Sequence, residues 1–148
     1  MSEHAETAIL LVEDNPADEE LTLRGLRRSA IANSIVVARD GAEALDRLLG
    51  RGEYADPVPP LPQVILLDLK LPKVDGLEVL AALRAHPRTR AVPVVVLTSS
   101  VEEQDIVRSY GLGANSYVRK PVDFTEFASA IQQLGLYWLV INQSPHRR

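Results

Sequence analysis

The stretch QVILLDLKLPKVDG, residues 63–76, places a carboxylate directly behind a short apolar run. Four apolar residues, Val64 to Leu67, precede Asp68 with no polar position among them. A continuous apolar run of this length is typical of a strand buried on both faces, as in a parallel sheet. A lysine and a proline follow before Gly76 opens a segment of helical length. The stretch therefore predicts a strand, a polar loop and a helix.

This alternation of a short apolar run with a longer amphipathic segment recurs along the whole chain. Asn15 precedes a proline at the first helical position, and Asp40 precedes a segment that ends at Gly50, so both are predicted N-caps. Capping-box spacing predicts two further helix starts at Ser100 and Asp123. The predicted strands are residues 8–12, 34–38, 64–67, 92–97 and 116–119, and the remaining helix is 76–86.

Five such units predict a doubly wound α/β fold, in which a five-stranded parallel sheet carries five helices on its two faces. The first helix is expected to bury a stripe made of Leu21, Leu23, Leu26 and Ala30. The 148 residues suit one domain with one sizeable core. The proline-rich stretch 51–62 is too short to link two domains, so a surface loop is expected there.

The composition of the chain argues against several classes of protein and of binding site. The formal net charge of −4 argues against a nucleic-acid partner, because phosphate binding calls for a basic surface. The chain has no cysteine, which excludes disulfides, zinc–thiolate sites and thiol chemistry. The acidic N-terminus does not resemble a signal peptide, and no apolar run has the length of a membrane span. These features predict a cytoplasmic protein without a membrane partner.

Polar side chains follow four of the five predicted strands, where ligands bind in such sheets. These residues are Glu13, Asp14, Asp68, Thr98, Ser99 and Lys120. Each alone has an ordinary explanation as a cap or a solvated loop residue. Together, three carboxylates at one edge would repel one another, and a hard divalent cation, Mg²⁺ or Mn²⁺, would relieve that repulsion. A metal, a lysine and a hydroxyl around Asp68 would suit a phosphoryl group held on that carboxylate.

The same residues carry a family pattern. The chain resembles a response-regulator receiver domain of two-component signalling in four motifs: LLVEDN, LLDLKLPKVDG, VVLTSS and GANSYVRKP. The motifs occur in the family's order, and the resemblance covers about residues 7–135. It implies a CheY-like, or flavodoxin-like, sheet with strand order 2-1-3-4-5. It also implies that residues 1–148 form a single receiver domain with a C-terminal extension at 136–148.

The resemblance assigns a role to each site residue. Asp68 would be the phosphoacceptor that attacks the phosphohistidine of a sensor kinase. The metal would be held by Asp14, Asp68 and the main-chain carbonyl of Lys70, with Glu13 acting through a water. Thr98, Ser99 and Lys120 would contact the phosphoryl group, and Tyr117 would be the switch aromatic that turns inward. Pro72, Gly76 and Pro121 would shape the site, with a cis bond between Lys120 and Pro121.

The last residues of the chain indicate how phosphorylation would be passed on to other proteins. About a dozen residues follow the last predicted helix, too few for an output domain, so we expect readout by protein contact or onward phosphotransfer. The tail LGLYWLVINQ is apolar on nearly every side, and it resembles the tails of single-domain regulators paired with bacterial phytochromes. A homodimer is predicted, with folding back onto the protein's own core as the alternative. The candidate contacts are Leu136, Tyr137, Trp138, Val140 and Ile141.

Two other functions fit parts of the pattern. A phosphatase of the haloacid-dehalogenase type also uses an aspartate nucleophile, Mg²⁺, a Thr or Ser and a lysine. It needs a second aspartate two residues after the first as general acid–base, and here that position is Lys70. A phosphorylation-independent adaptor with the same fold is the other alternative, against which the intact Asp14, Asp68, Thr98 and Lys120 argue. A signalling protein that is not an enzyme is therefore expected.

Overall fold

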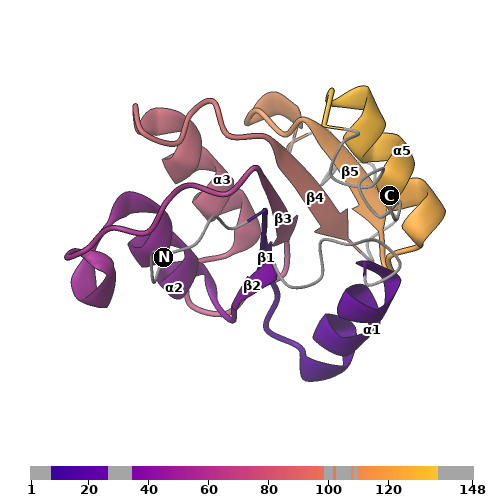
Figure 1. The fold of residues 1–148 in the computed structure, drawn as a ribbon, viewed down its shortest axis with the longest axis horizontal. Helices are drawn as coiled ribbons and strands as arrows, with labels where there is room; N and C mark the ends of the chain where they lie inside the picture. Colours follow the sequence, from indigo (N-terminus) through magenta and orange to yellow (C-terminus); the bar gives the residue numbers. More distant parts are fainter. Residues whose placement is uncertain (1–7, 27–34, 99–101, 103–107, 109, 137–148) are drawn as a thin grey trace, which may run out of the picture.

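A five-stranded parallel sheet in the order β2-β1-β3-β4-β5 forms the centre of the computed structural model (Figure 1). The structure describes residues 8–26, 35–98, 102, 108 and 110–136. The strands are β1 (Ile9–Val12), β2 (Ile35–Ala38), β3 (Val64–Asp68), β4 (Val94–Thr98) and β5 (Ser116–Arg119). The parallel sheet and the predicted strand order are confirmed.

Register brings the carboxyl ends of the central strands together. Val12 at the end of β1 pairs with Leu67, one residue before Asp68. Asp68 in turn pairs with Leu97, and Thr98 pairs with Arg119, one residue before Lys120. Because all these strands run in the same direction, the polar residues that end them lie along one edge of the sheet.

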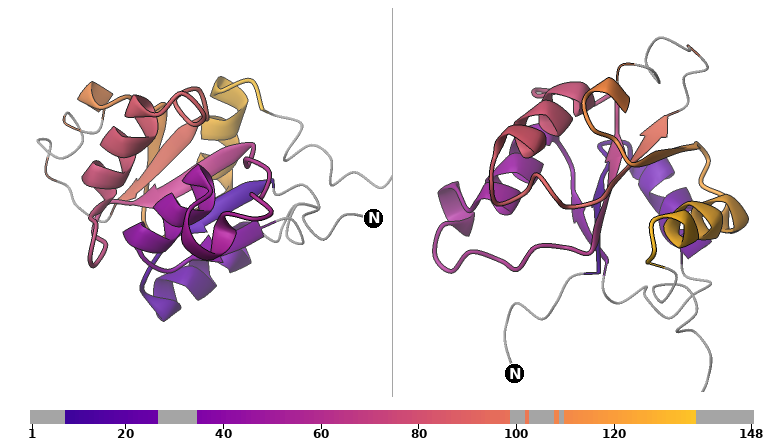
Figure 2. Two further views of the ribbon diagram at one scale, coloured as in Figure 1. Left: turned by 90° about the vertical axis from the view of Figure 1, so that its left-hand side faces the viewer. Right: turned by 90° about the horizontal axis from the view of Figure 1, so that it is seen from above.

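Two layers of helices cover the sheet. The helices are α1 (Pro16–Leu26), α2 (Gly41–Leu49), α3 (Gly76–Ala85) and α5 (Phe124–Gln133). Figure 2 shows α2 and α3 on one face of the sheet and α1 and α5 on the other. Of the predicted fourth helix, Arg108, Tyr110 and Gly111 are helical, while its predicted start at Ser100 lies outside the described residues.

Strand alternation divides the core between the two faces. On β3, Ile65 and Leu67 pack towards α2 and α3, whereas Val64 and Leu66 pack towards α1 and α5. All five residues of β3 are buried, as the continuous apolar run predicted. Strands buried on both faces hold their last residues rigidly, which fixes the position of Asp68.

The N-caps predicted at Asn15 and Asp40 are present in the structure, whereas one predicted capping box is not. Asn15 Oδ1 accepts a hydrogen bond from the Asp18 N–H at 3.0 Å, and the Asp40 side chain accepts from the Glu43 N–H. The capping box predicted at Asp123 is wrong, because its side chain accepts from the Thr125 N–H, one residue short of box spacing. The structure instead has a complete capping box at the start of α3, made by Asp75 and Glu78.

The buried face of α1 also differs from the predicted stripe. Leu21 is 45% exposed, whereas Thr22 and Leu26 are buried four residues apart on the side that meets the sheet. Leu23 is partly buried beside them, and Ala30 lies outside the described residues. Leu26 of the predicted stripe is thus buried and Leu21 is wrong, because Thr22 takes its place in the buried face and a threonine carries no apolar signal in the sequence.

The stretch 51–62 is a largely exposed loop that contains a short 3-10 helix, η2 (Gly52–Tyr54). Arg88 holds this loop in place, since its guanidinium donates to the Leu48 carbonyl at 3.0 Å and to the Pro59 carbonyl at 2.9 Å. The predicted surface loop is confirmed, and a cis peptide bond precedes Pro57 in it.

The end of α5 turns back onto the domain. Gly135 has φ +78°, and the Leu136 N–H donates to the Ile131 carbonyl at 3.0 Å, which is the Schellman arrangement. Leu136 then packs against the core beneath α1 and α5. This residue was expected in a dimer contact, and its packing is that of the fold-back alternative. Tyr137, Trp138, Val140 and Ile141 lie outside the described residues. Within the described ranges, the helices are too short or too polar to cross a membrane.

Candidate functional site

Three carboxylates meet at the carboxyl ends of β1 and β3. Glu13, Asp14 and Asp68 each present one oxygen, and these oxygens all lie within 4.8 Å of one another. Glu13 and Asp68 are buried, whereas Asp14 is exposed. The sequence predicted this meeting, and the side-by-side register of β1 and β3 explains it.

Lys120 joins these acids from β5, across the width of the sheet. Its ammonium group lies 3.0 Å from Glu13 Oε1, 3.1 Å from Asp68 Oδ2 and 2.8 Å from Asp18 Oδ2. The backbone positions the side chain, since the Lys120 N–H donates to the Thr98 carbonyl at 3.0 Å. The predicted cis bond between Lys120 and Pro121 is confirmed.

The pKa values of Glu13 and Lys120 are both raised, for different physical reasons. Burial, together with the hydrogen bond and negative charge of Asp68, raises the pKa of Glu13 from 4.5 to about 7, despite the opposing effect of Lys120. Burial alone would lower the pKa of Lys120, but its bonds to Asp18 and Glu13 and the charge of Asp68 outweigh burial and raise it. Lys120 therefore stays protonated, while Glu13 shares its site with a second buried carboxyl.

The loop after Asp68 fits tightly around it. The Lys70 N–H donates to Asp68 Oδ1 at 3.1 Å, which fixes the orientation of the carboxylate. Gly76 closes the loop, because its N–H donates to the Leu69 carbonyl at 3.0 Å. A Cβ atom at Gly76 would lie 2.3 Å from the carbonyl oxygen of Asp68, so a side chain has no room there. Pro72 lies exposed within this loop.

The residues expected to contact or sense the phosphoryl group lie on β4 and β5. Thr98 is fully buried at the end of β4. Ser99 lies outside the described residues. Tyr117 is 38% exposed, and its ring meets that of Tyr110 edge to face, with centroids 5.6 Å apart. Tyr117 is thus on the outer side of the sheet edge, in contact with Tyr110.

Sequence reasoning missed Asp18. It lies in the first turn of α1, four residues after Asp14, and among the carboxylates of Glu13, Asp18 and Asp68 it makes the shortest contact with Lys120. The signal was available, because helical spacing from the capped start of α1 directs this position back towards the sheet edge.

Ion pairs surround the cluster on its outer side. Arg39 contacts Glu19 at 2.9 Å and links β2 to α1. Lys73 contacts Asp40 at 3.2 Å and links the loop before α3 to the start of α2. Both pairs connect segments that follow or precede strands and helices at this end of the sheet, so they hold α1, the end of β2, the start of α2 and the loop before α3 together.

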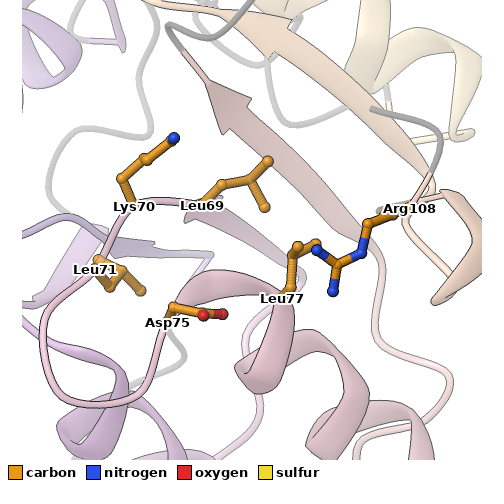
Figure 3. Close-up of a pocket in the computed structure, with 6 residues that line it drawn as sticks. All are labelled: Leu69, Lys70, Leu71, Asp75, Leu77 and Arg108. Carbon is orange, nitrogen blue, oxygen red and sulfur yellow. The ribbon is translucent and has the colours of Figure 1, made fainter. Parts of the chain in front are cut away.

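Two hollows open at this edge. The one that contains the acids has a volume of about 250 Å³ and is lined by Glu13, Asp14, Asn15, Asp18, Asp68, Lys70 and Lys120. A neighbouring pocket of about 410 Å³ has Lys70 and Leu71 on one side and Arg108 on the other, with Leu69, Asp75 and Leu77 between them (Figure 3). Lys70 lines both hollows.

The donor set of the acidic hollow fits a hard divalent cation. All three convergent ligand atoms are carboxylate oxygens, the ligands that Mg²⁺ and Mn²⁺ accept, and no thiol competes because the chain has no cysteine. A buried carboxylate beside a metal and a fixed ammonium group can act as a nucleophile towards phosphorus, since both cations oppose the negative charge of the incoming group.

Comparison with known proteins agrees with this chemistry. The family model for the response regulator receiver domain matches residues 9–132. The chain is 44% identical over 138 residues to the probable methanogenesis regulatory protein FilR2 of Methanothrix harundinacea, covering 93% of this chain and 86% of that protein. It is 42% identical over 131 residues to the response regulator Rcp1 of a Synechocystis strain, covering 88% of each.

Solved structures give the same result. The bacteriophytochrome response regulator AtBRR superimposes with a TM-score of 0.80 at 58% identity, covering 90% of this chain and 95% of that one. An Mn²⁺-bound form of Rcp1 superimposes with a TM-score of 0.73 at 41% identity, covering 90% and 94%. Neither the phosphatase nor the adaptor alternative is favoured by these matches. The chain belongs to the response regulator receiver domain family of two-component signalling.

Proposed function

We propose that Asp68 accepts a phosphoryl group from the phosphohistidine of a sensor histidine kinase. One observation carries the proposal: Lys120, from the far edge of the sheet, lies 3.1 Å from Asp68 Oδ2 within a cluster of carboxylates. A buried acid of this kind needs cations around it, and an ammonium group already in contact can also bind a phosphoryl oxygen.

The transfer balances as a simple displacement. A carboxylate oxygen of Asp68 forms a bond to phosphorus while the bond between phosphorus and the histidine nitrogen breaks. The electron pair of that bond stays on the imidazole, which leaves as the neutral ring when its other nitrogen carries a proton, and Asp68 becomes an acyl phosphate. Lys120 contributes its positive charge to a phosphoryl oxygen, and the Lys70 N–H keeps the carboxylate oriented during the attack.

Asp14, Asp68 and the main-chain carbonyl of Lys70 would hold Mg²⁺, with Glu13 acting through a water. The closeness of the three carboxylates supports this set, and the Mn²⁺-bound form of the related Rcp1 supports a divalent cation. When bound, the metal would neutralise charge that develops on the phosphoryl oxygens.

Thr98, with Ser99 beside it, would bind a phosphoryl oxygen, and Tyr117 would respond by turning inward. Thr98 is buried at the strand end next to Asp68, which supports its part in this switch. Tyr117 would have to leave the ring of Tyr110, so the contact between these tyrosines would differ between the two states.

The partners proposed for this chain follow from its relatives. A bacterial phytochrome would be the sensor kinase, since AtBRR is named as a bacteriophytochrome response regulator. The protein would act in the cytoplasm as a signalling protein rather than an enzyme, by contact with another protein or onward phosphotransfer. A homodimer formed through residues 137–148 would be one such contact.

Labelling with acetyl phosphate and Mg²⁺ tests the acceptor. We expect the intact mass to rise by one phosphoryl group in the wild type and in Asp46→Asn, an exposed acid paired with Arg51. The mass of Asp68→Asn should stay unchanged. Labelling of Asp68→Asn at the wild-type rate, or no labelling of the wild type while another receiver reacts, would rule out the assignment.

Shortening the tail tests the dimer. Removal of residues 137–148 retains Leu136, which completes the end of α5, so the domain should stay folded. Light scattering of the full chain should give twice the monomer mass, and the shortened chain should give the monomer mass. A shortened chain that remains dimeric would exclude the tail as the contact.

A further inference from the structure

Every donor of the Lys120 ammonium group already has a carboxylate partner. A lysine has three N–H donors and no acceptor. In this structure three carboxylates lie within ion-pair distance of it, those of Glu13, Asp18 and Asp68. A phosphoryl oxygen on Asp68 can therefore be bound by Lys120 only if one of these contacts is given up.

The contact with Asp18 is the one that can be exchanged. The side chains of Glu13 and Asp68 are 0% and 4% exposed, so losing Lys120 would leave either as a buried, unpaired acid. The Asp18 side chain is 37% exposed, so water can replace Lys120 as its partner. The free energy needed to release Lys120 is therefore lowest at Asp18.

The negative charge of Asp18 also opposes binding of a phosphoryl group to Asp68. The hollow around Asp68 is lined by four carboxylates, of which only that of Asp18 lies on a helix, against two lysines. A phosphoryl donor is itself an anion, so each carboxylate in this hollow opposes its entry. Asp18 thus acts twice, by holding Lys120 and by repelling the group that Lys120 would bind.

We propose that Asp18 is a positioning residue that holds Lys120 on the α1 side of the site and competes with the phosphoryl group for it. Asp18 keeps the lysine fixed while Asp68 is unmodified, and it lowers the affinity of the site for a phosphoryl group. This inference rests on the proposed role of Asp68 as acceptor. It adds to that site a residue on α1 that sets the balance between the modified and unmodified protein.

The test compares Asp18→Asn with Glu20→Gln, a matched loss of one acid on the same helix. Glu20 pairs with Arg24 and not with Lys120, and its side chain is 54% exposed. Beryllofluoride is the probe, because it binds to an acceptor carboxylate as a phosphoryl group does. At saturating Mg²⁺ we expect Asp18→Asn to bind it about 2- to 5-fold more tightly, the range that the energy of an exposed ion pair implies. Glu20→Gln should bind it as the wild type does.

A second measurement follows Lys120 itself, without metal or phosphoryl analogue. The ¹⁵N signal of its ammonium group should shift in Asp18→Asn and stay in place in Glu20→Gln. Asp18→Glu, which keeps the carboxylate, should return both the signal and the beryllofluoride affinity towards wild-type values. The urea unfolding midpoint of Asp18→Asn should fall by no more than the loss of one exposed ion pair implies, and Glu20→Gln, which also loses one exposed ion pair, should fall by no more than that.

The outcomes separate the two proposals. If the wild type is not labelled by acetyl phosphate, the proposed acceptor role fails, while a shifted Lys120 signal would still show the pair with Asp18. If the wild type is labelled but Asp18→Asn and Glu20→Gln have equal affinities, the competition is overturned. A loss of stability with no gain in affinity would likewise overturn it, because Asp18 would then be merely structural.

Discussion

The backbone of Gly76 lies against the backbone of Asp68 so closely that a Cβ atom would lie 2.3 Å from the Asp68 carbonyl oxygen and 2.5 Å from Leu69 Cα. Both neighbours are main-chain atoms, so neither can rotate away as a side chain would. The first residue of α3 and the last residue of β3 are thus in direct contact, and the loop between them has its ends fixed.

Gly76→Ala should therefore disturb the acceptor. We expect it to lower the free energy of unfolding by about 1–3 kcal/mol, as overpacking does. The rate of labelling by acetyl phosphate should also fall, because Asp68 must move. Urea denaturation and intact mass measure the two effects. Gly111→Ala is the control, since a Cβ there meets nothing within 4 Å. Equal stability of the two variants would contradict the tight contact.

The buried carboxyl of Glu13 predicts an unusual pH dependence. Its pKa is raised from 4.5 to about 7 by burial and by Asp68. The folded protein therefore binds a proton more tightly than the unfolded chain, and folding is favoured less as pH rises through this window. Without metal, the loss between pH 4.5 and 7 should reach about 3 kcal/mol.

Urea denaturation in a chelator, from pH 4.5 to 8, measures this loss. The matched variant is Glu13→Gln, which keeps the shape of the side chain but cannot ionise. The difference in stability between wild type and variant should widen in favour of the variant as pH rises. Parallel curves would show that Glu13 does not titrate in this range.

Arg84 is a half-buried cation surrounded by neutral acceptors. Its guanidinium donates to five oxygens at 2.9–3.4 Å, those of the Gly113, Thr89, Arg90 and Val92 carbonyls and Asn115 Oδ1. These bonds join the end of α3 to the loops that enter β4 and β5. Burial lowers the pKa of the side chain, yet the ring of oxygens holds it as a donor.

Arg84→Met should destabilise the protein by about 2 kcal/mol or more, because it leaves several partly buried carbonyls without a partner. Arg90→Met is the control, since Arg90 is exposed and its carbonyl stays in place. The control should lie within about 0.5 kcal/mol of the wild type. Urea denaturation measures both, and similar values for the two variants would refute the role given to Arg84.

We expect Asp40 to stabilise the protein through the N-cap hydrogen bond that it forms at the start of α2, and not through its charge alone. Its Oδ1 accepts from the Glu43 N–H at 2.7 Å, and its Oδ2 contacts Lys73. Asp40→Ala should lower the free energy of unfolding by about 1 kcal/mol, whereas Asp40→Asn, which still caps, should lose only a few tenths. The hydrogen bond to the Glu43 N–H, above all, lowers the pKa of Asp40, so the effect of Asp40→Ala should shrink as pH falls below 3.8. Thermal unfolding of the three proteins at pH 7 and pH 3 is the measurement.

Much of this architecture was predictable because the buried strands of a parallel sheet appear in the sequence as continuous apolar runs. The unbroken run before Asp68 and the caps at Asn15 and Asp40 each have a local physical cause, and the structure retains them. The meeting of Asp68 with Lys120 followed from parallel strands alone, since all their carboxyl ends share one edge.

The predictions that failed, or that the sequence did not offer, depend on packing that has no local signal. Buried Thr22 looks polar in the sequence, so the face of α1 was assigned to Leu21. Asp18 looks like an ordinary first-turn acid until α1 is docked beside β5. The oxygens around Arg84 come from two separate loops, those that enter β4 and β5, and no spacing within one segment could indicate them.

The contact between Lys120 and Glu13 spans 107 positions of the chain, and this has a consequence during synthesis. All the acids of the site leave the ribosome before the strand that carries their cation. A chain that ends before β5 has all these acids but lacks the ammonium group that contacts Glu13 and Asp68 in the folded protein. The acids can therefore be paired with Lys120 only after the chain has been synthesised through the residue that follows the last strand.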